Sequence, residues 1–223
     1  MDTNFRIPKH SVPISILDAS IPTSRYCPLD LSSDNKDLEG IRISNADECQ
    51  KYILKVLKRN NALVAYGGYL EKRNLYEASD RFKEGKQRNI HLGVDFWCEA
   101  GTAVLAPIDG KIHSFANNED FGNYGPTIIL EHEYLGRVFY SLYGHLSLSS
   151  LEGLSLNQDI KKGQDFATLG TPDINVGYAP HLHFQLILDI GAYKGDYPGV
   201  CAADELAFYK NNCPDPKPFL GVG

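Results

Sequence analysis

The sequence predicts a mainly β protein, with a core of two packed antiparallel sheets in a barrel-sandwich arrangement and a small N-terminal helical addition. Short apolar runs rich in β-branched and aromatic residues recur along the chain, separated by Gly and Asp-Gly turns. One earlier segment instead repeats apolar residues at helical spacing. The chain has 223 residues, of which 43% are hydrophobic and 22% charged, so it can bury a substantial core.

The sequence of the N-terminal quarter predicts that this part of the chain forms an irregular arm followed by one helix. Residues 1–44 carry scattered Pro, Ser and Asp, and we expect them to pack on the domain as an arm. Asn45 is a suitable N-cap, and Glu48 three residues later completes a capping-box pattern, which predicts a helix over residues 45–60. Its apolar face, which we expect to contact the core, consists of Cys49, Tyr52, Ile53, Val56 and Leu57.

Strands are predicted from residue 62 onward. The runs that share strand composition and turn boundaries are 62–66, 91–97, 103–106, 111–115, 127–132, 137–143 and 182–188. The turn at residues 133–136 predicts a hairpin, and residues 203–211 predict a short helix. We therefore divide the chain into an arm and helix (1–61), a β domain (62–190) and a C-terminal extension (191–223).

Composition restricts the class of partner. The net charge of −6 argues against nonspecific binding to nucleic acid or to anionic membranes. No stretch approaches the roughly 20 apolar residues of a membrane span, so we expect no membrane span. We also expect the protein to be a monomer. The N-terminus has no basic start followed by an apolar run, which predicts a cytoplasmic protein, or a periplasmic or extracellular one if the sequence is a processed form.

The five cysteines form no CxxC pair, and we expect mainly reduced or buried thiols. A disulfide between Cys201 and Cys213 stays open as an alternative, because a short loop could join them.

Chemistry-bearing residues gather in three short motifs. His91 and Asp95 share a face at spacing i, i+4, and Gly93 between them leaves space for an ion, although a structural His–Asp hydrogen bond is an equal alternative. His181 and His183 point to one side of a strand, where two buried imidazoles are costly without a purpose. The alternative for this pair is a partly exposed position at the rim of the sheet.

The third motif is Tyr143-Gly-His145-Leu, whose Tyr and His also share a face. Taken in order, the three motifs resemble the lysostaphin- and LytM-type zinc metallopeptidases, which cut peptidoglycan cross-bridges and stem peptides. Residues 101–112 and 160–170 resemble the same family, and the resemblance extends over residues 88–188. It implies the barrel-sandwich architecture that lipoyl and glucose-permease domains also have.

The resemblance also implies the roles of single residues. It makes His91, Asp95 and His183 the ligands of one Zn²⁺, which leaves a position for water. We expect His181 to be the general base and His145 to stabilise the transition state of peptide-bond hydrolysis. The open groove is expected near residues 116–126 and 171–180, with candidate substrate contacts from Tyr143, Tyr178 and Asn123.

Three further histidines match no motif. We expect His10, His113 and His132 to be structural or surface residues, and the Glu-His-Glu context of His132 predicts a solvated face.

The sequence departs from the family at two places. Residues 171–180 replace a shorter Gly-Thr-Gly segment beside the substrate groove, and residues 81–88 stand where an arginine-containing stretch is usual. Tyr193, Tyr197 and Pro198 are consistent with a groove wall or with packing of the tail, and we favour tail packing.

Three other functions compete with an endopeptidase. The main alternative is a metal-binding but non-catalytic domain that binds peptide or peptidoglycan or regulates another enzyme; the complete set of five site residues argues against it. A biotinyl or lipoyl carrier is suggested by residues 104–112, but it needs a Met-Lys hairpin tip and the only methionine is Met1. A cupin oxygenase needs a Glu shortly after the histidine pair, where only Asp189 is found.

Overall fold

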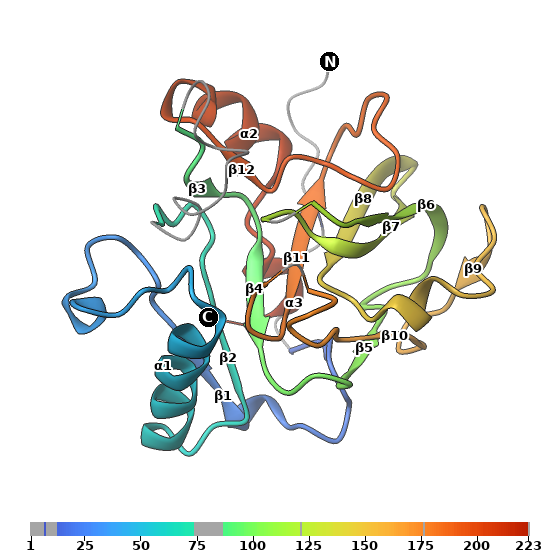
Figure 1. The fold of residues 1–223 in the computed structure, drawn as a ribbon. Coiled ribbons are helices and arrows are strands. Elements are labelled where there is room, and N and C mark those ends of the chain that lie inside the picture. The colour runs from blue at the N-terminus through green and yellow to red at the C-terminus, as the bar shows by residue number, and fades with distance from the viewer. Residues whose placement is uncertain (1–6, 8–12, 74–86, 121, 176, 223) are drawn as a thin grey trace.

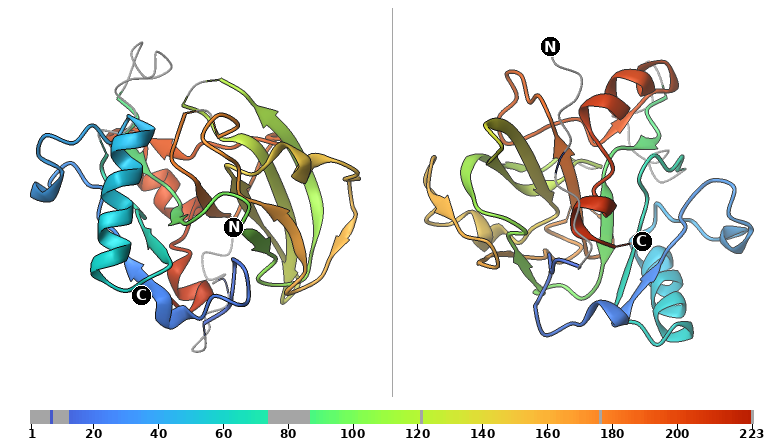
Figure 2. Two further views of the ribbon diagram at one scale, coloured as in Figure 1. Left: turned by 60° about the horizontal axis from the view of Figure 1, so that its bottom comes forward. Right: turned by 180° about the vertical axis from the view of Figure 1, so that it is seen from behind.

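The computed structural model describes residues 7, 13–73, 87–120, 122–175 and 177–222. Strands dominate it, which confirms the mainly β fold class (Figure 1). A large twisted sheet forms the centre, α1 (Ala46–Arg59) flanks the sheet beside β1 and β2, and α2 (Leu206–Asn212) lies at the opposite end. Figure 2 shows the same arrangement from two further directions.

The large sheet has eight strands in the order β1-β2-β4-β11-β8-β7-β6-β9. Their bounds, in that order, are Tyr26–Pro28, Val64–Gly67, Val94–Trp97, His181–Ile187, Arg137–Gly144, Gly125–Tyr134, Gly110–Asn118 and Asp159–Ile160. Among the described residues, β1 and β2 are the one parallel pair of this sheet, and the other neighbours are antiparallel. β1 was not predicted, because the segment before residue 45 shows no strand pattern.

Two small sheets complete the β structure. β5 (Ala103–Leu105) pairs with β10 (Asp165–Thr168), and β3 (Ile90–His91) pairs with β12 (Val200–Cys201). Val104 and Ala167 of the first pair share one buried cluster with Phe96 and Phe184 of the large sheet. The two packed sheets that were predicted are therefore unequal in size, and the main core lies between them.

The predicted hairpin joins β7 and β8, with Tyr134 opposite Arg137. Its two turn residues, Leu135 and Gly136, have φ angles of 51° and 71°. Positive φ at both positions is the geometry that matches the twist of a two-residue hairpin.

The helix predicted over residues 45–60 is α1. The Asn45 side chain accepts a hydrogen bond from the Glu48 N–H at 3.0 Å, as an N-cap does. The Glu48 carboxylate binds Arg42 instead of the Asn45 N–H, which already donates to the Arg42 carbonyl, so the second half of the predicted capping box is wrong. The buried face of α1 packs in one cluster with Ala65 and Trp97 of the sheet.

Short helices fill the connections. They are the 3₁₀ helices Thr23–Arg25, Lys36–Leu38, Leu148–Leu151 and Ala203–Glu205, followed by α2 and α3 (Lys217–Leu220). The first two belong to the N-terminal arm, and Ala203–Glu205 with α2 forms the predicted C-terminal helix. No helix in the described ranges is long and apolar enough to cross a membrane.

All five cysteines are buried free thiols, which confirms the prediction and leaves Cys201 and Cys213 unbridged.

His132 lies in the core, so the predicted solvated face is wrong. Its ring is 1% exposed on β7, and Nε2 lies 2.6 Å from Ser141 Oγ while Nδ1 lies 2.8 Å from the Asp109 carbonyl. Burial lowers its pKa to about 4, against a smaller opposing effect of the Asp109 carbonyl. His113 is half-buried on β6, and His10 lies outside the described residues.

We predict that His132 makes the stability of the protein depend on pH. Its folded pKa of about 4 is below the usual 6.5, so protons bind the unfolded state more tightly. The stability is complete above pH 6.5 and is lost as the pH falls toward 4. Between pH 7 and pH 5, the free energy of unfolding of the metal-free protein, measured in urea, should fall by about 2 kcal/mol more in the wild type than in His132→Gln.

His113→Gln serves as the control. Because His113 is only half-buried, this substitution should remove a smaller part of the pH dependence than His132→Gln does. Equal pH dependence in His132→Gln and the wild type would contradict the prediction.

Candidate metal centre and its pocket

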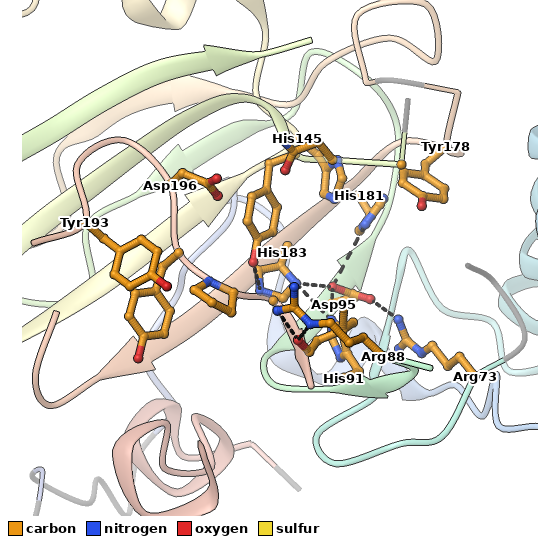
Figure 3. A pocket seen from close by; sticks show the side chains of 17 residues that line it. Arg73, Arg88, His91, Asp95, His145, Tyr178, His181, His183, Tyr193 and Asp196 are labelled. Atoms are coloured by element: carbon orange, nitrogen blue, oxygen red, sulfur yellow. Dashed lines mark hydrogen bonds and ion pairs between the residues drawn. The ribbon is translucent and has the colours of Figure 1, made fainter. Parts of the chain in front are cut away.

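The three side chains predicted as metal ligands converge on one point (Figure 3). His91 Nε2 lies 2.9 Å from His183 Nδ1 and 3.3 Å from Asp95 Oδ1, and the last two atoms are 3.2 Å apart. Ligands placed 2.0–2.1 Å from a tetrahedral zinc ion are about 3.3 Å from one another. The three donors therefore have the spacing and the chemistry of a site for one divalent ion.

Sheet register brings two of these ligands together. β4 and β11 are antiparallel neighbours, with Asp95 opposite His183 and Trp97 opposite His181. Residues directly opposite on an antiparallel pair point to the same face. This face is opposite to the main core, which receives Phe184 and Leu182 from β11.

Gly93 makes room for the third ligand. A Cβ atom at this position would lie 2.7 Å from His183 Cε1 and 2.7 Å from the Phe184 carbonyl oxygen. The glycine thus lets β4 approach the His183 ring, while the chain before it carries His91 to the same point.

Hydrogen bonds fix which nitrogen of each ligand faces the centre. His91 Nδ1 lies 2.9 Å from the Gly68 carbonyl and donates to it, which leaves Nε2 as the ligand atom. His183 Nε2 donates to Gln185 Oε1 at 2.9 Å, which leaves Nδ1 as its ligand atom. The Gln185 amide is held in turn by the Pro198 carbonyl, at 3.1 Å.

Asp95 is held by a buried cation. Arg73 Nη1 donates to Asp95 Oδ2 at 2.5 Å, and both side chains are 2% exposed. Burial by itself would raise the pKa of Asp95, but His91, Arg73 and His181 together hold it well below its usual range. The Asp95 carboxylate is therefore ionised at pH 7.

The other two predicted site residues, His145 and His181, lie beside the three ligands. Their ring centroids are 4.1 Å apart, and the His181 ring stacks on Trp97 at 3.9 Å. His181 Nδ1 donates to the Ala179 carbonyl at 2.8 Å, so Nε2 points toward the centre, 4.0 Å from Asp95 Oδ1. Figure 3 shows both rings on the same side of the cluster as Tyr178.

A turn in the backbone explains the position of His145. It follows the last residue of β8 and has a φ of 64°, in the left-handed region. Strict alternation would place its side chain on the face of Tyr143, inside the core. Because the chain leaves the strand at this residue, the His145 ring turns to the opposite face and meets His181.

Burial also sets the protonation of the histidines. It lowers the pKa values of His91 and His181 to about 4, and the pKa of His145 falls well below its usual range. Protonation of His181 or His183 would lower the pKa of His145 further, because like charges repel. The rings of His91, His145 and His181 are therefore neutral at pH 7, which is the state that metal binding and proton acceptance require.

A pocket opens on this cluster. The residues that line it besides the five above are Arg73, Arg88, Gly122, Asn123, Tyr124, Tyr178, Tyr193, Asp196, Tyr197, Pro198, Gly199 and Val200. Both predicted loops, near 116–126 and 171–180, contribute to it. Tyr193, Tyr197 and Pro198 line it, so the favoured tail-packing prediction is wrong for Tyr193 and Pro198, whereas Tyr197 both lines the pocket and packs against the C-terminal segment.

Two of the three predicted substrate contacts lie in this pocket, namely Asn123 and Tyr178. Tyr143 does not: it is fully buried on the core face of β8, and its hydroxyl accepts from Ser141 Oγ at 3.1 Å. Its placement in the groove is therefore corrected, because it was based on sharing a face with His145.

Sequence reasoning missed four residues around the ligands, namely Arg73, Arg88, Tyr124 and Gln185. Gln185 had a usable signal, since it follows His183 by two positions on one strand. Arg88 is the last residue of the atypical stretch 81–88, of which residues 81–86 lie outside the described part of the chain; its guanidinium donates to the Val200 carbonyl at 2.8 Å.

Comparison with known proteins finds similarity to peptidases over part of the chain. Residues 89–194 match the model of peptidase family M23. The chain is 38% identical to an uncharacterized metalloprotease of Haemophilus influenzae over 95 residues. This stretch is 43% of this chain and 18% of that protein. The chain is 30% identical to the glycyl-glycine endopeptidase ALE-1 of Staphylococcus capitis over 130 residues. This stretch is 58% of this chain and 29% of that protein.

Among solved structures, the catalytic domain of lysostaphin from Staphylococcus simulans is 28% identical, with a TM-score of 0.40, over 65% of this chain and 88% of that chain. The chain spans less than a third of the length of the two curated relatives above. The match to the family model and the similarity to the glycyl-glycine endopeptidase confirm the resemblance to lysostaphin-type metallopeptidases that the motifs predicted.

We predict that Gly93→Ala disrupts the metal centre. The added methyl group meets a backbone carbonyl on one side, so the His183 ring must move away from His91 and Asp95. Zinc affinity, measured by competition with a chromophoric chelator, should fall about 10–100-fold.

Gly153→Ala is the matched control, because Gly153 has a φ of 70° in open space. This substitution should lower the melting temperature through backbone strain but leave zinc affinity unchanged. Wild-type zinc affinity in Gly93→Ala would show that the ring has room to move.

Proposed function

We propose that this chain is a zinc-dependent endopeptidase that hydrolyses peptide bonds in peptidoglycan cross-bridges or stem peptides. The observation that supports it most directly is the cluster of His91, Asp95 and His183, whose donor atoms face a pocket that also contains two buried neutral imidazoles. The match to peptidase family M23 and the similarity to a glycyl-glycine endopeptidase support the same reaction class.

In this proposal His91 Nε2, Asp95 Oδ1 and His183 Nδ1 hold the zinc ion. A zinc ion held there by three protein ligands would acidify a water molecule and would polarise the carbonyl of the scissile bond. The Gly68 and Gln185 hydrogen bonds keep the two imidazoles in the tautomers that this binding needs.

We assign proton transfer to His181. Its Nδ1–H is held by the Ala179 carbonyl, so Nε2 has a lone pair directed at the centre. Because its pKa is lowered to about 4 by burial, His181 is neutral at pH 7 and can accept the proton of the attacking water. Stacking on Trp97 fixes the plane of the ring.

We assign stabilisation of the developing oxyanion to His145. Its ring packs against His181, and the Tyr124 ring lies 5.7 Å away on another side. A donor positioned at the reacting carbonyl is worth the most where water is excluded, and His145 is 5% exposed. Asn123 and Tyr178, at the rim of the same pocket, are the proposed contacts of the peptide chain.

Two alanine variants should separate metal binding from proton transfer. His183→Ala should lose zinc, measured by elemental analysis, because one of three ligands is gone. His181→Ala should keep one zinc ion per chain and lose about 10²–10⁴-fold in kcat, because the proton acceptor is gone. Full hydrolysis by His181→Ala would refute its assignment as the base.

Digestion of purified peptidoglycan and of glycine-rich and alanine-containing peptides tests the reaction itself. We expect the zinc-loaded protein to cleave peptide bonds, with products identified by mass spectrometry. Removal of zinc with EDTA should abolish cleavage, and added zinc should restore it. Zinc-loaded protein that binds peptidoglycan but cleaves none of these substrates would support the non-catalytic binding or regulatory domain instead.

A further inference from the structure

The metal ligands are braced by a segment that precedes the matched domain. The match to the peptidase family begins at residue 89, whereas β2 and the residues after it, up to Arg73, come earlier in the chain. β2 pairs with β4, and Gly67 lies opposite the ligand Asp95. The backbone of residues 70–73 bonds to that of His91 and Asn89. The candidate metal centre thus has a wall that the matched domain does not supply.

Arg73 is the charged group of this wall. Its guanidinium is 2% exposed, and it bonds to two carboxylates through different nitrogen atoms. Nη1 donates to Asp95 Oδ2, and Nε donates to Glu71 Oε2, each at 2.5 Å. The planar fork of an arginine can hold two carboxylates at fixed angles, which the single ammonium of a lysine cannot do.

The two oxygens of Asp95 therefore have different partners. Oδ2 is occupied by Arg73, whereas Oδ1 lies 3.2 Å from His183 Nδ1 and 3.3 Å from His91 Nε2. Only Oδ1 faces the point shared by the two imidazoles. Figure 3 shows Arg73 on the far side of Asp95 from His183.

Glu71 balances the charge of Arg73 and ties it to the N-terminal arm. Its Oε2 accepts from Arg73 Nε, and its Oε1 accepts from the Leu31 N–H at 3.1 Å. The negative charge of Glu71 offsets the cation, so Asp95 keeps its own charge for a metal ion. Leu31 is fully buried in the cluster that α1 forms with the sheet, which anchors this chain of contacts.

A glycine allows the close packing of this wall. A Cβ atom at Gly68 would overlap the Arg73 guanidinium and lie 2.9 Å from His91 Nδ1. Gly68 also has a φ of 104°, and its carbonyl accepts from His91. One short loop therefore orients His91 through a carbonyl and Asp95 through a guanidinium.

We propose that Arg73 is a positioning residue that restricts Asp95 to binding the metal ion through Oδ1 alone, and that it thereby keeps a coordination position open for water. This inference rests on the proposed zinc site. Asp95 in the absence of the Arg73 fork would be able to offer both oxygens and fill that position. The bracing segment is as much part of the centre as the three ligands.

Arg73→Lys tests the proposal, because it keeps the positive charge and removes the fork. In the full-length protein we expect zinc affinity, measured by chelator competition, to fall about 10–100-fold. The visible spectrum of the cobalt-loaded protein should weaken, because cobalt absorbs less strongly when it has five or six ligands than when it has four. Thermal unfolding in EDTA reports whether the metal-free fold is retained.

Arg42→Lys is the matched control, since Arg42 forms the same kind of pair with Glu48 on the surface of the N-terminal addition. It should leave zinc affinity and the cobalt spectrum unchanged. If Arg73→Lys does not fold, Glu71→Gln takes its place: it keeps Arg73 but removes the balancing charge, and it should lower zinc affinity by about tenfold.

Zinc affinity within twofold of the wild type, or an unchanged cobalt spectrum, in the folded Arg73→Lys protein would overturn the proposal. In Glu71→Gln, an unchanged zinc affinity would do the same. Failure of the proposed function gives a different result: the wild type itself then binds no zinc, or binds zinc and cleaves no peptide. Absence of zinc binding overturns both proposals, whereas absence of cleavage leaves the assignment of Arg73 to be decided by the affinities and spectra.

Discussion

The antiparallel register of β4 against β11 is the constraint on which the rest of the site depends. It sets Asp95 opposite His183 on one face, while Val94 and Phe184 enter the main core on the other. A slip of one residue would exchange the two faces and bury the ionisable groups among apolar side chains. The apolar half of each strand therefore stabilises the polar half, because the free energy of the core fixes the register that the metal centre needs.

Burial of so many polar groups in one place is costly, and the structure offsets the cost with specific partners. Asp95 has Arg73, His91 has the Gly68 carbonyl, and His183 has Gln185. A buried charge without such partners would destabilise the fold by several kcal/mol. Two buried atoms in this region, His145 Nδ1 and Asn175 Oδ1, have no hydrogen-bond partner in the described residues. The two side chains nevertheless interact, because the Asn175 amide raises the pKa of His145 against the effect of burial.

The ligand set could be assigned from the sequence because its three motifs resemble a known family, and local periodicity added which side chains share a face. His181 and His183 share a face on any strand, and the long apolar runs around them predict that strand. The position of Tyr143 could not be read, because one left-handed residue, His145, breaks the alternation after β8. Alternation along β7 places His132 in the core, between the half-buried Glu131 and the exposed Glu133, whereas the charges of these two neighbours indicate a solvated face. Arg73 lies 22 residues before Asp95, and no local pattern connects the two.

The two outer strands of the large sheet are its shortest. β1 has three residues and ends in Pro28, which lacks an N–H, and β9 has two residues. The long strands β6, β7 and β8 lie in the interior of the sheet, where both sides of each backbone are used. A strand from another molecule would find few free backbone groups at either edge before the chain turns away. The large sheet is thus protected against edge-to-edge aggregation by the shortness of its two outer strands.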